Sequence, residues 1–178
     1  MRKGRSSRPE PAILGRPDPT PFADLAASSW RGGRNVSLEH NKALARRLYE
    51  EVFGRGNLVA ADEILAGSCV SHGPGSPPER GAEFIKRQAF ALRSAIPDLE
   101  VVLADQIAEG DEVASRWTGR GTHTGALPLP TGAVAPTGAH IEFAEIRIDR
   151  VDGDRITESW FIPDRFTLWQ QLGIIPKS

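Results

Sequence analysis

The stretch from residue 141 to residue 162 reads IEFAEIRIDRVDGDRITESWFI. The polarity of its residues alternates with a period of two on both sides of a break, which is typical of β-strands. The break is Asp152-Gly153-Asp154, a sequence that favours a tight hairpin turn. We therefore predict two antiparallel strands, at 141–151 and 155–162. Pro163, which cannot donate a backbone hydrogen bond, ends the second one.

A second hairpin is predicted immediately upstream. Residues 99–108 and 113–122 alternate in the same way, and Glu109-Gly110-Asp111 is the turn between them. A loop rich in proline and glycine, residues 125–138, separates the two hairpins. A short helix over 166–172 closes the chain.

The part of the chain before these strands has the helical period of 3.6. Ser37 is a suitable N-cap for a helix whose apolar stripe includes Leu44, Leu48 and Val52. Further helices are predicted over 57–65 and 84–96. Helices followed by an antiparallel meander indicate an α+β domain, in which a strongly bent sheet wraps the N-terminal helices and encloses a cavity suited to a small ligand.

Composition excludes several classes of protein. The chain has 178 residues and a formal net charge of −1, so a basic nucleic-acid footprint is absent. No window approaches the ~18 consecutive apolar residues of a membrane span. Residues 1–37 carry seven cations against three anions and five prolines, which predicts a flexible arm before a domain at 38–178. A solvated extension and a partner-binding arm both remain open.

Short motifs in this order resemble the SnoaL-like polyketide cyclases of the nuclear transport factor 2-like superfamily. The resemblance covers roughly residues 38–175. It rests on Gly119-Arg120-Gly121-Thr122-His123-Thr124-Gly125, Pro136-Thr137-Gly138, Glu158-Ser159-Trp160 with Asp164, and Gln171-Leu172-Gly173. It implies a cone-shaped α+β fold, ring closure by intramolecular aldol condensation without metal or cofactor, a cytoplasmic homodimer, and a small hydrophobic or aromatic carbonyl substrate.

The chain departs from these cyclases at two places. Their acid/base aspartate lies three residues before the position of Asp164, where this chain has Phe161, which cannot transfer a proton. The loop before Pro136 is longer and contains Pro130-Thr131-Gly132, which suggests a remodelled pocket rim.

Two residues are the candidate catalytic groups. Asp164 follows the last strand among apolar neighbours, which would raise the pKa of its carboxyl group and suit acid/base work. The alternative is that it caps the helix that begins after it. His123 ends a strand and could donate to an enolate oxygen or shuttle a proton. The alternative is that it binds a loop carbonyl.

Candidate substrate-binding residues are His72, Trp117, Glu145, Arg147, Trp160 and Phe161. Glu145, Arg147 and Asp149 share one face of the strand 141–151. If that face points inward, the charges must be paired, because an isolated buried charge is very costly. The alternative is a sheet surface joined to a second subunit.

The sequence therefore predicts a cofactor-independent cyclase, most simply a polyketide ester cyclase of lyase or isomerase type. Alternatives are a non-catalytic module of the same fold that binds a small ligand or a partner, and a hydrolase or hydroxylation helper. No metal site is predicted, because the four histidines lack the short spacing of metal ligands.

Overall fold

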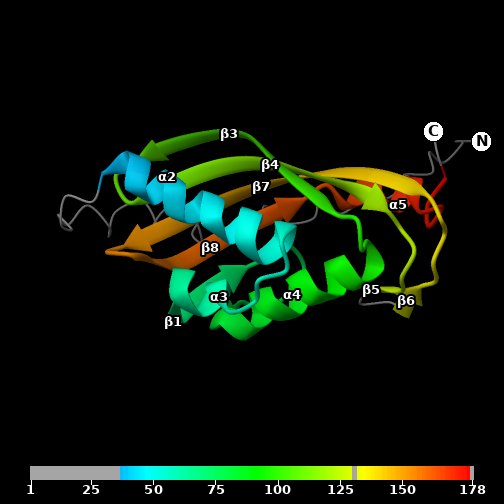
Figure 1. The fold of residues 1–178 in the computed structure, drawn as a ribbon, viewed down its shortest axis with the longest axis horizontal. Helices are drawn as coiled ribbons and strands as arrows, with labels where there is room; N and C mark the ends of the chain where they lie inside the picture. Colours follow the sequence, from blue (N-terminus) through cyan, green and yellow to red (C-terminus); the bar gives the residue numbers. More distant parts are fainter. Residues whose placement is uncertain (1–36, 130–131, 177–178) are drawn as a thin grey trace, which may run out of the picture. The chain divides into compact units, whose positions relative to one another are not determined.

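The computed structural model describes residues 37–129 and 132–176. Six strands in this part form one curved sheet, in the order β2-β1-β8-β7-β4-β3. Figure 1 shows helices α2, α3 and α4 along one side of this sheet. The strands are β1 (Leu65–His72), β2 (Glu79–Arg80), β3 (Glu100–Glu109), β4 (Glu112–Thr122), β7 (His140–Asp152) and β8 (Arg155–Pro163). The predicted α+β architecture is confirmed.

The first helix has two parts. Helix α2 (Leu38–Arg47) starts at Ser37, whose Oγ accepts a hydrogen bond from the backbone N–H of His40 at 3.2 Å, as predicted. The chain then continues as a π-helix, η1 (Leu48–Gly54), which the sequence pattern does not reveal. This segment matters because π-helical turns occur frequently at functional sites.

The other helices lie where they were predicted but differ in their bounds. Helix α3 spans only Ala60–Ile64, whereas α4 runs from Ala82 to Ala95 and α5 from Arg165 to Gln171. Arg93 of α4 donates to the carbonyl oxygen of Gly54 at 2.6 Å and thereby ties α4 to the end of η1. None of the helices in the described ranges is long and apolar enough to cross a membrane.

The helices pack their apolar stripe against the sheet. Leu48 and Val52 are completely buried, and Trp117 of β4 and Ile156 of β8 belong to the same core cluster. Burial of this kind stabilises a fold by roughly 25 cal/mol per Å² of apolar surface. The core thus holds η1 against the sheet, and the Tyr49 side chain of η1 reaches Trp117 of β4 and Glu145 of β7.

Four strands, β1, β2, β5 and β6, were not expected where they occur. Residues Leu65–His72 form β1, which pairs in parallel with β8, so the sheet is mixed rather than wholly antiparallel. A parallel partner lies far away in sequence, and local alternation therefore cannot predict it. Within the predicted loop 125–138, β5 (Leu127–Leu129) and β6 (Gly132–Val134) form a separate two-stranded sheet.

The two long hairpins agree with the predicted boundaries to within a residue or two. The predicted arm, up to residue 36, and the residues Pro130-Thr131 of the predicted pocket rim lie outside the described ranges.

Candidate functional site

The inner face of β7 carries a row of charged side chains beneath the helices. Arg147 is 1% exposed and Asp149 is 0% exposed, while Glu145 is only partly buried. The register places Trp117 of β4 opposite Glu145, and Phe161 of β8 opposite Arg147. Of the two alternatives for this face, the inward one is confirmed, and the row runs from an accessible end at Glu145 to a deep end at Asp149.

Arg147 and Asp149 form the buried ion pair that an inward orientation requires. The Nε atom of Arg147 lies 2.8 Å from Oδ1 of Asp149, and the hydroxyl of Ser159 donates to the same oxygen at 2.6 Å. Two charges removed from water stay stable only with such direct pairing. The pair therefore anchors the polar row in the protein interior.

Glu145 is the carboxyl group with the properties of a general base. Burial raises its pKa, and the attraction of Arg147 and the hydrogen bond from the Tyr49 hydroxyl offset part of that rise. Burial also raises the pKa of Tyr49 well above its usual value, so its hydroxyl stays protonated and donates. A carboxylate whose pKa is shifted toward neutrality is a better proton acceptor than an ordinary one.

Aromatic rings surround this row. Tyr49 stacks on Trp117 with a ring-centre distance of 3.9 Å, and the Arg147 guanidinium lies 5.8 Å from the Tyr49 ring and 5.7 Å from the Phe161 ring. The structure thus brings together four of the predicted substrate-binding residues: Trp117, Glu145, Arg147 and Phe161. Cationic groups over aromatic faces are mutually stabilising.

Side chains fill much of the interior that was predicted to be hollow. A Cβ atom added to Gly73 would meet the Phe161 ring at 2.5 Å, and one added to Gly119 would meet the Phe143 ring at 2.6 Å. Two hollows, of about 690 and 310 Å³, lie elsewhere. The first is lined by Thr137, Ala139 and residues 170–176, and the second by Arg55, Gly56 and Leu58, which follow η1, together with residues of α4. Neither of these two hollows is lined by a residue of the charged row.

The predicted rise in the pKa of the Asp164 carboxyl group is wrong. Its side chain is exposed, and its Oδ1 atom accepts from the backbone N–H of Thr167 at 3.0 Å, so it caps α5. These hydrogen bonds lower the pKa of Asp164 instead of raising it. The capping alternative is confirmed, because the chain turns outward after Pro163 and leaves the carboxylate in water.

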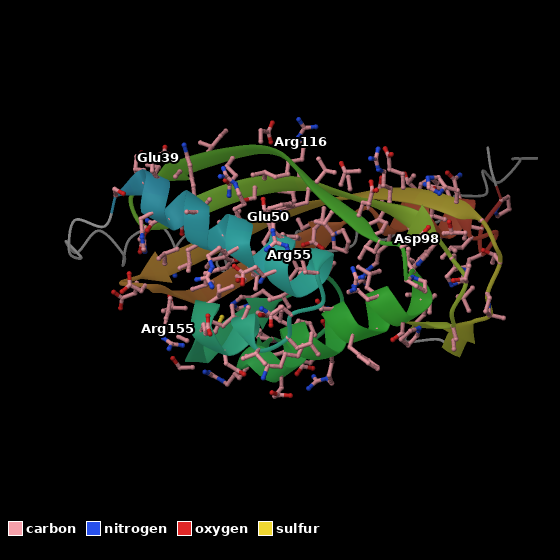
Figure 2. The ribbon with its side chains drawn as sticks, in the orientation of Figure 1. Glu39, Glu50, Arg55, Asp98, Arg116 and Arg155 are labelled. Atoms are coloured by element: carbon pink, nitrogen blue, oxygen red, sulfur yellow. The ribbon has the colours of Figure 1, made fainter. Side chains whose placement is uncertain are left out.

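His123 lies on the inner side of the fold but at the far end of β4. It is completely buried, and its Nδ1 atom accepts from the backbone N–H of Thr137 at 3.3 Å. Burial lowers its pKa. Asp98 holds this end of β4 by accepting from the backbone N–H and hydroxyl of Thr122, at 2.7 and 2.8 Å (Figure 2).

Trp117 and His123 are six positions apart, which corresponds to roughly 20 Å of strand. The structure therefore does not bring His123 to Glu145.

His72 and Trp160 lie on the opposite, outer face of the sheet, which corrects their predicted place in the cavity. They are paired in register and stack with a ring-centre distance of 5.2 Å, and His72 Nε2 lies 2.8 Å from Glu158 Oε1. The reason is strand alternation: Ser71 and Phe161, their neighbours in sequence, take the inner positions.

The row contains residues that the sequence did not single out as functional. Tyr49 lies beside the apolar stripe of the first predicted helix, yet its hydroxyl reaches Glu145. Asp149 was noted only for its face, and Ser159 only as part of a motif. The alternation of charges on 141–151 was the one available signal, because Tyr49 and Ser159 acquire their roles through tertiary contacts.

No metal centre is evident in the described residues, where His, Cys, Asp and Glu form no group of three or more that could hold an ion. Cys69 is buried, and burial raises the pKa of its thiol to about 11, which leaves it unreactive at neutral pH.

Comparisons with known proteins give a family match and several similar structures. The profile of the SnoaL-like polyketide cyclase family matches residues 43–172. IdmH, a candidate polyketide cyclase from Streptomyces antibioticus, is 32% identical over 75% of this chain and 98% of its own, with a TM-score of 0.64. A candidate polyketide cyclase from Acidithiobacillus ferrooxidans is 29% identical over 78% and 99%, also at 0.64.

AclR, a candidate hydroxylase from Streptomyces galilaeus, is 23% identical over 80% of this chain and 86% of its own, with a TM-score of 0.69, a likeness of fold. Among curated proteins, none matches the sequence.

Proposed function

Because the chain belongs to the SnoaL-like polyketide cyclase family, we propose that it is a cofactor-independent enzyme that closes a ring in a polyketide or a similar carbonyl compound. Glu145 is the proton acceptor in this proposal. The observation that carries it is the raised pKa of a partly buried carboxyl group that faces Tyr49 and Arg147. The absence of an acid at position 161 then marks a relocated base.

The chemistry follows from ordinary acid/base steps. The Glu145 carboxylate removes a proton from a carbon beside a carbonyl group, and the resulting enolate attacks a second carbonyl of the same molecule. One carbon–carbon bond forms, and the second carbonyl becomes an alkoxide. The proton held by Glu145 then passes to that alkoxide, so the carboxylate is regenerated.

Arg147 supports the charge changes of this sequence. Its guanidinium is buried and positive, so it stabilises a negative oxygen nearby more strongly than water does. Tyr49 keeps the carboxyl oriented through its hydrogen bond. Both roles need a site with little water, which the aromatic rings around the row provide.

The test uses Glu145→Gln, which keeps the shape of the side chain and removes the base. Wild type and variant are incubated with aromatic β-keto esters that carry a second carbonyl, and products are followed by mass spectrometry and NMR. We expect a cyclised isomer, or that isomer less one water, from wild type, and a loss of at least about 100-fold in turnover from the variant.

Asp164→Asn is the control and is expected to retain turnover, because its side chain is exposed. Full turnover by Glu145→Gln would contradict the proposal. Tight binding without turnover by wild type would favour the ligand-binding module instead.

We also propose that a second copy of the chain covers the outer face of the sheet. Four isoleucines of this face are exposed, by 38–74%: Ile107, Ile146, Ile148 and Ile162. Exposed apolar patches of this kind mark association surfaces. Light scattering is expected to give a dimer for wild type and a monomer for Ile162→Glu, while Val59→Glu, which changes an exposed residue next to α3, stays dimeric. A monomeric wild type would refute this.

A further inference from the structure

Three buried polar atoms at the deep end of the row have no hydrogen-bond partner within the described residues. They are the hydroxyl of Ser71, Nη2 of Arg147 and Oδ2 of Asp149. Their side chains are at most 1% exposed. Buried polar groups are nearly always paired, and each unpaired one costs roughly 1–3 kcal/mol. Three in one place therefore call for an explanation.

These atoms belong to one continuous cluster. Ser71 of β1 is in register with Ser159 of β8, and Ser159 is in register with Asp149 of β7. Ser159 and Arg147 both bind Oδ1 of Asp149, at 2.6 and 2.8 Å. An arginine and a carboxylate often make two parallel bonds. Here the second bond is not made, which leaves Nη2 of the arginine and Oδ2 of the aspartate unpaired.

We propose that Ser71, Arg147 and Asp149 form a subsite that binds a hydroxyl group of the substrate. A hydroxyl group has one hydrogen to donate and two lone pairs to accept with. Asp149 Oδ2 accepts a hydrogen bond from the substrate hydroxyl, and Arg147 Nη2 and the Ser71 hydroxyl donate hydrogen bonds to its oxygen. A ketone oxygen has no hydrogen for Asp149, and a carboxylate is repelled by it.

The position of this subsite limits the shape of the ligand. Glu145 and Asp149 are four residues apart, which corresponds to roughly 13 Å of strand. The rings of Tyr49, Trp117 and Phe161 pack around the row along this length. The inference rests on the proposed function, because it places the hydroxyl at the end of a flat aromatic substrate opposite the carbon that Glu145 deprotonates.

Binding of three matched probes tests the subsite. They are 6-hydroxy-2-acetonaphthone, 6-methoxy-2-acetonaphthone and 2-acetonaphthone, and their affinities are measured by calorimetry. We expect the hydroxylated probe to bind wild type about tenfold more tightly than either of the others, the ratio that one buried hydrogen bond of about 1.4 kcal/mol gives. Ser71→Ala is expected to remove most of this preference.

Ser115→Ala is the matched control, because Ser115 is another buried serine on the inner face whose hydroxyl already has Gln106 as a partner at 3.1 Å. It is expected to keep the tenfold preference. Equal affinity for the hydroxylated and methoxylated probes would overturn the inference, as would an unchanged preference in Ser71→Ala. Either result would mean that the three atoms hold only water.

If wild type binds none of the probes, the titrations are repeated with Phe161→Ala, in which a ring beside the row is removed. The same preference for the hydroxylated probe is expected in this variant, and the absence of that preference would overturn the inference. The same titrations in Glu145→Gln separate this inference from the proposed function. If Glu145→Gln keeps both the preference for the hydroxylated probe and full turnover, only the role of Glu145 as base is refuted. If Glu145→Gln loses turnover but wild type shows no preference for the hydroxylated probe, only the subsite is refuted.

Discussion

Asp149→Asn gives the sharpest test of the buried ion pair. The substitution keeps an oxygen for Ser159 and Arg147 to bind, but it removes the charge that neutralises Arg147. Both partners are at most 1% exposed, so water cannot replace the lost charge. Breaking a buried pair in this way costs about 3–5 kcal/mol, a large part of the roughly 5–15 kcal/mol that stabilises a typical domain.

The free energy of unfolding in urea at pH 7 measures this loss, and the melting temperature should fall by roughly 6–20 °C. The matched control is Asp105→Asn, which breaks an exposed cross-strand pair on the outer face, where Asp105 lies 3.0 Å from Arg116. Figure 2 labels Arg116. The effect of this control substitution should be far smaller, because water solvates the arginine that is left.

A double variant separates charge from shape. Arg147→Met with Asp149→Leu removes both charges and keeps apolar volume, and it is expected to recover most of the stability lost in Asp149→Asn. A loss under about 1 kcal/mol in Asp149→Asn would refute the reasoning, and so would a double variant as unstable as the single one. Either result would mean that the attraction between Arg147 and Asp149 does not offset the desolvation cost that their burial implies.

Two further predictions concern titration. Glu145→Gln should be more stable than wild type at pH 7, because a carboxyl whose pKa is raised by folding loses stability as pH rises through that pKa. The difference in unfolding free energy should vanish below about pH 4, near the pKa of the unfolded chain. Asp164→Ala should melt at a lower temperature at pH 7 and keep its turnover, and this deficit should shrink as pH falls through the lowered pKa of Asp164. A deficit that is independent of pH, or a loss of turnover, would contradict the capping role.

Local patterns in the sequence were enough for the hairpins and for the charged face of β7. Turn residues such as Gly110 and Gly153, which have positive φ angles, act within a few positions of the chain, and alternation assigns side chains to faces without any tertiary contact. The grouping of Glu145, Arg147 and Asp149 on one face was therefore predictable.

Only the tertiary structure decided which face is buried and what meets it. Tyr49 reaches Glu145 across 96 positions of the chain. Ser71 joins the row because β1 pairs in parallel with β8. The pKa of a carboxyl group depends on the water it keeps, so the pKa values of Glu145 and Asp164 shift in opposite directions. Solvation and long-range contacts are properties of the folded chain, and no short segment contains them.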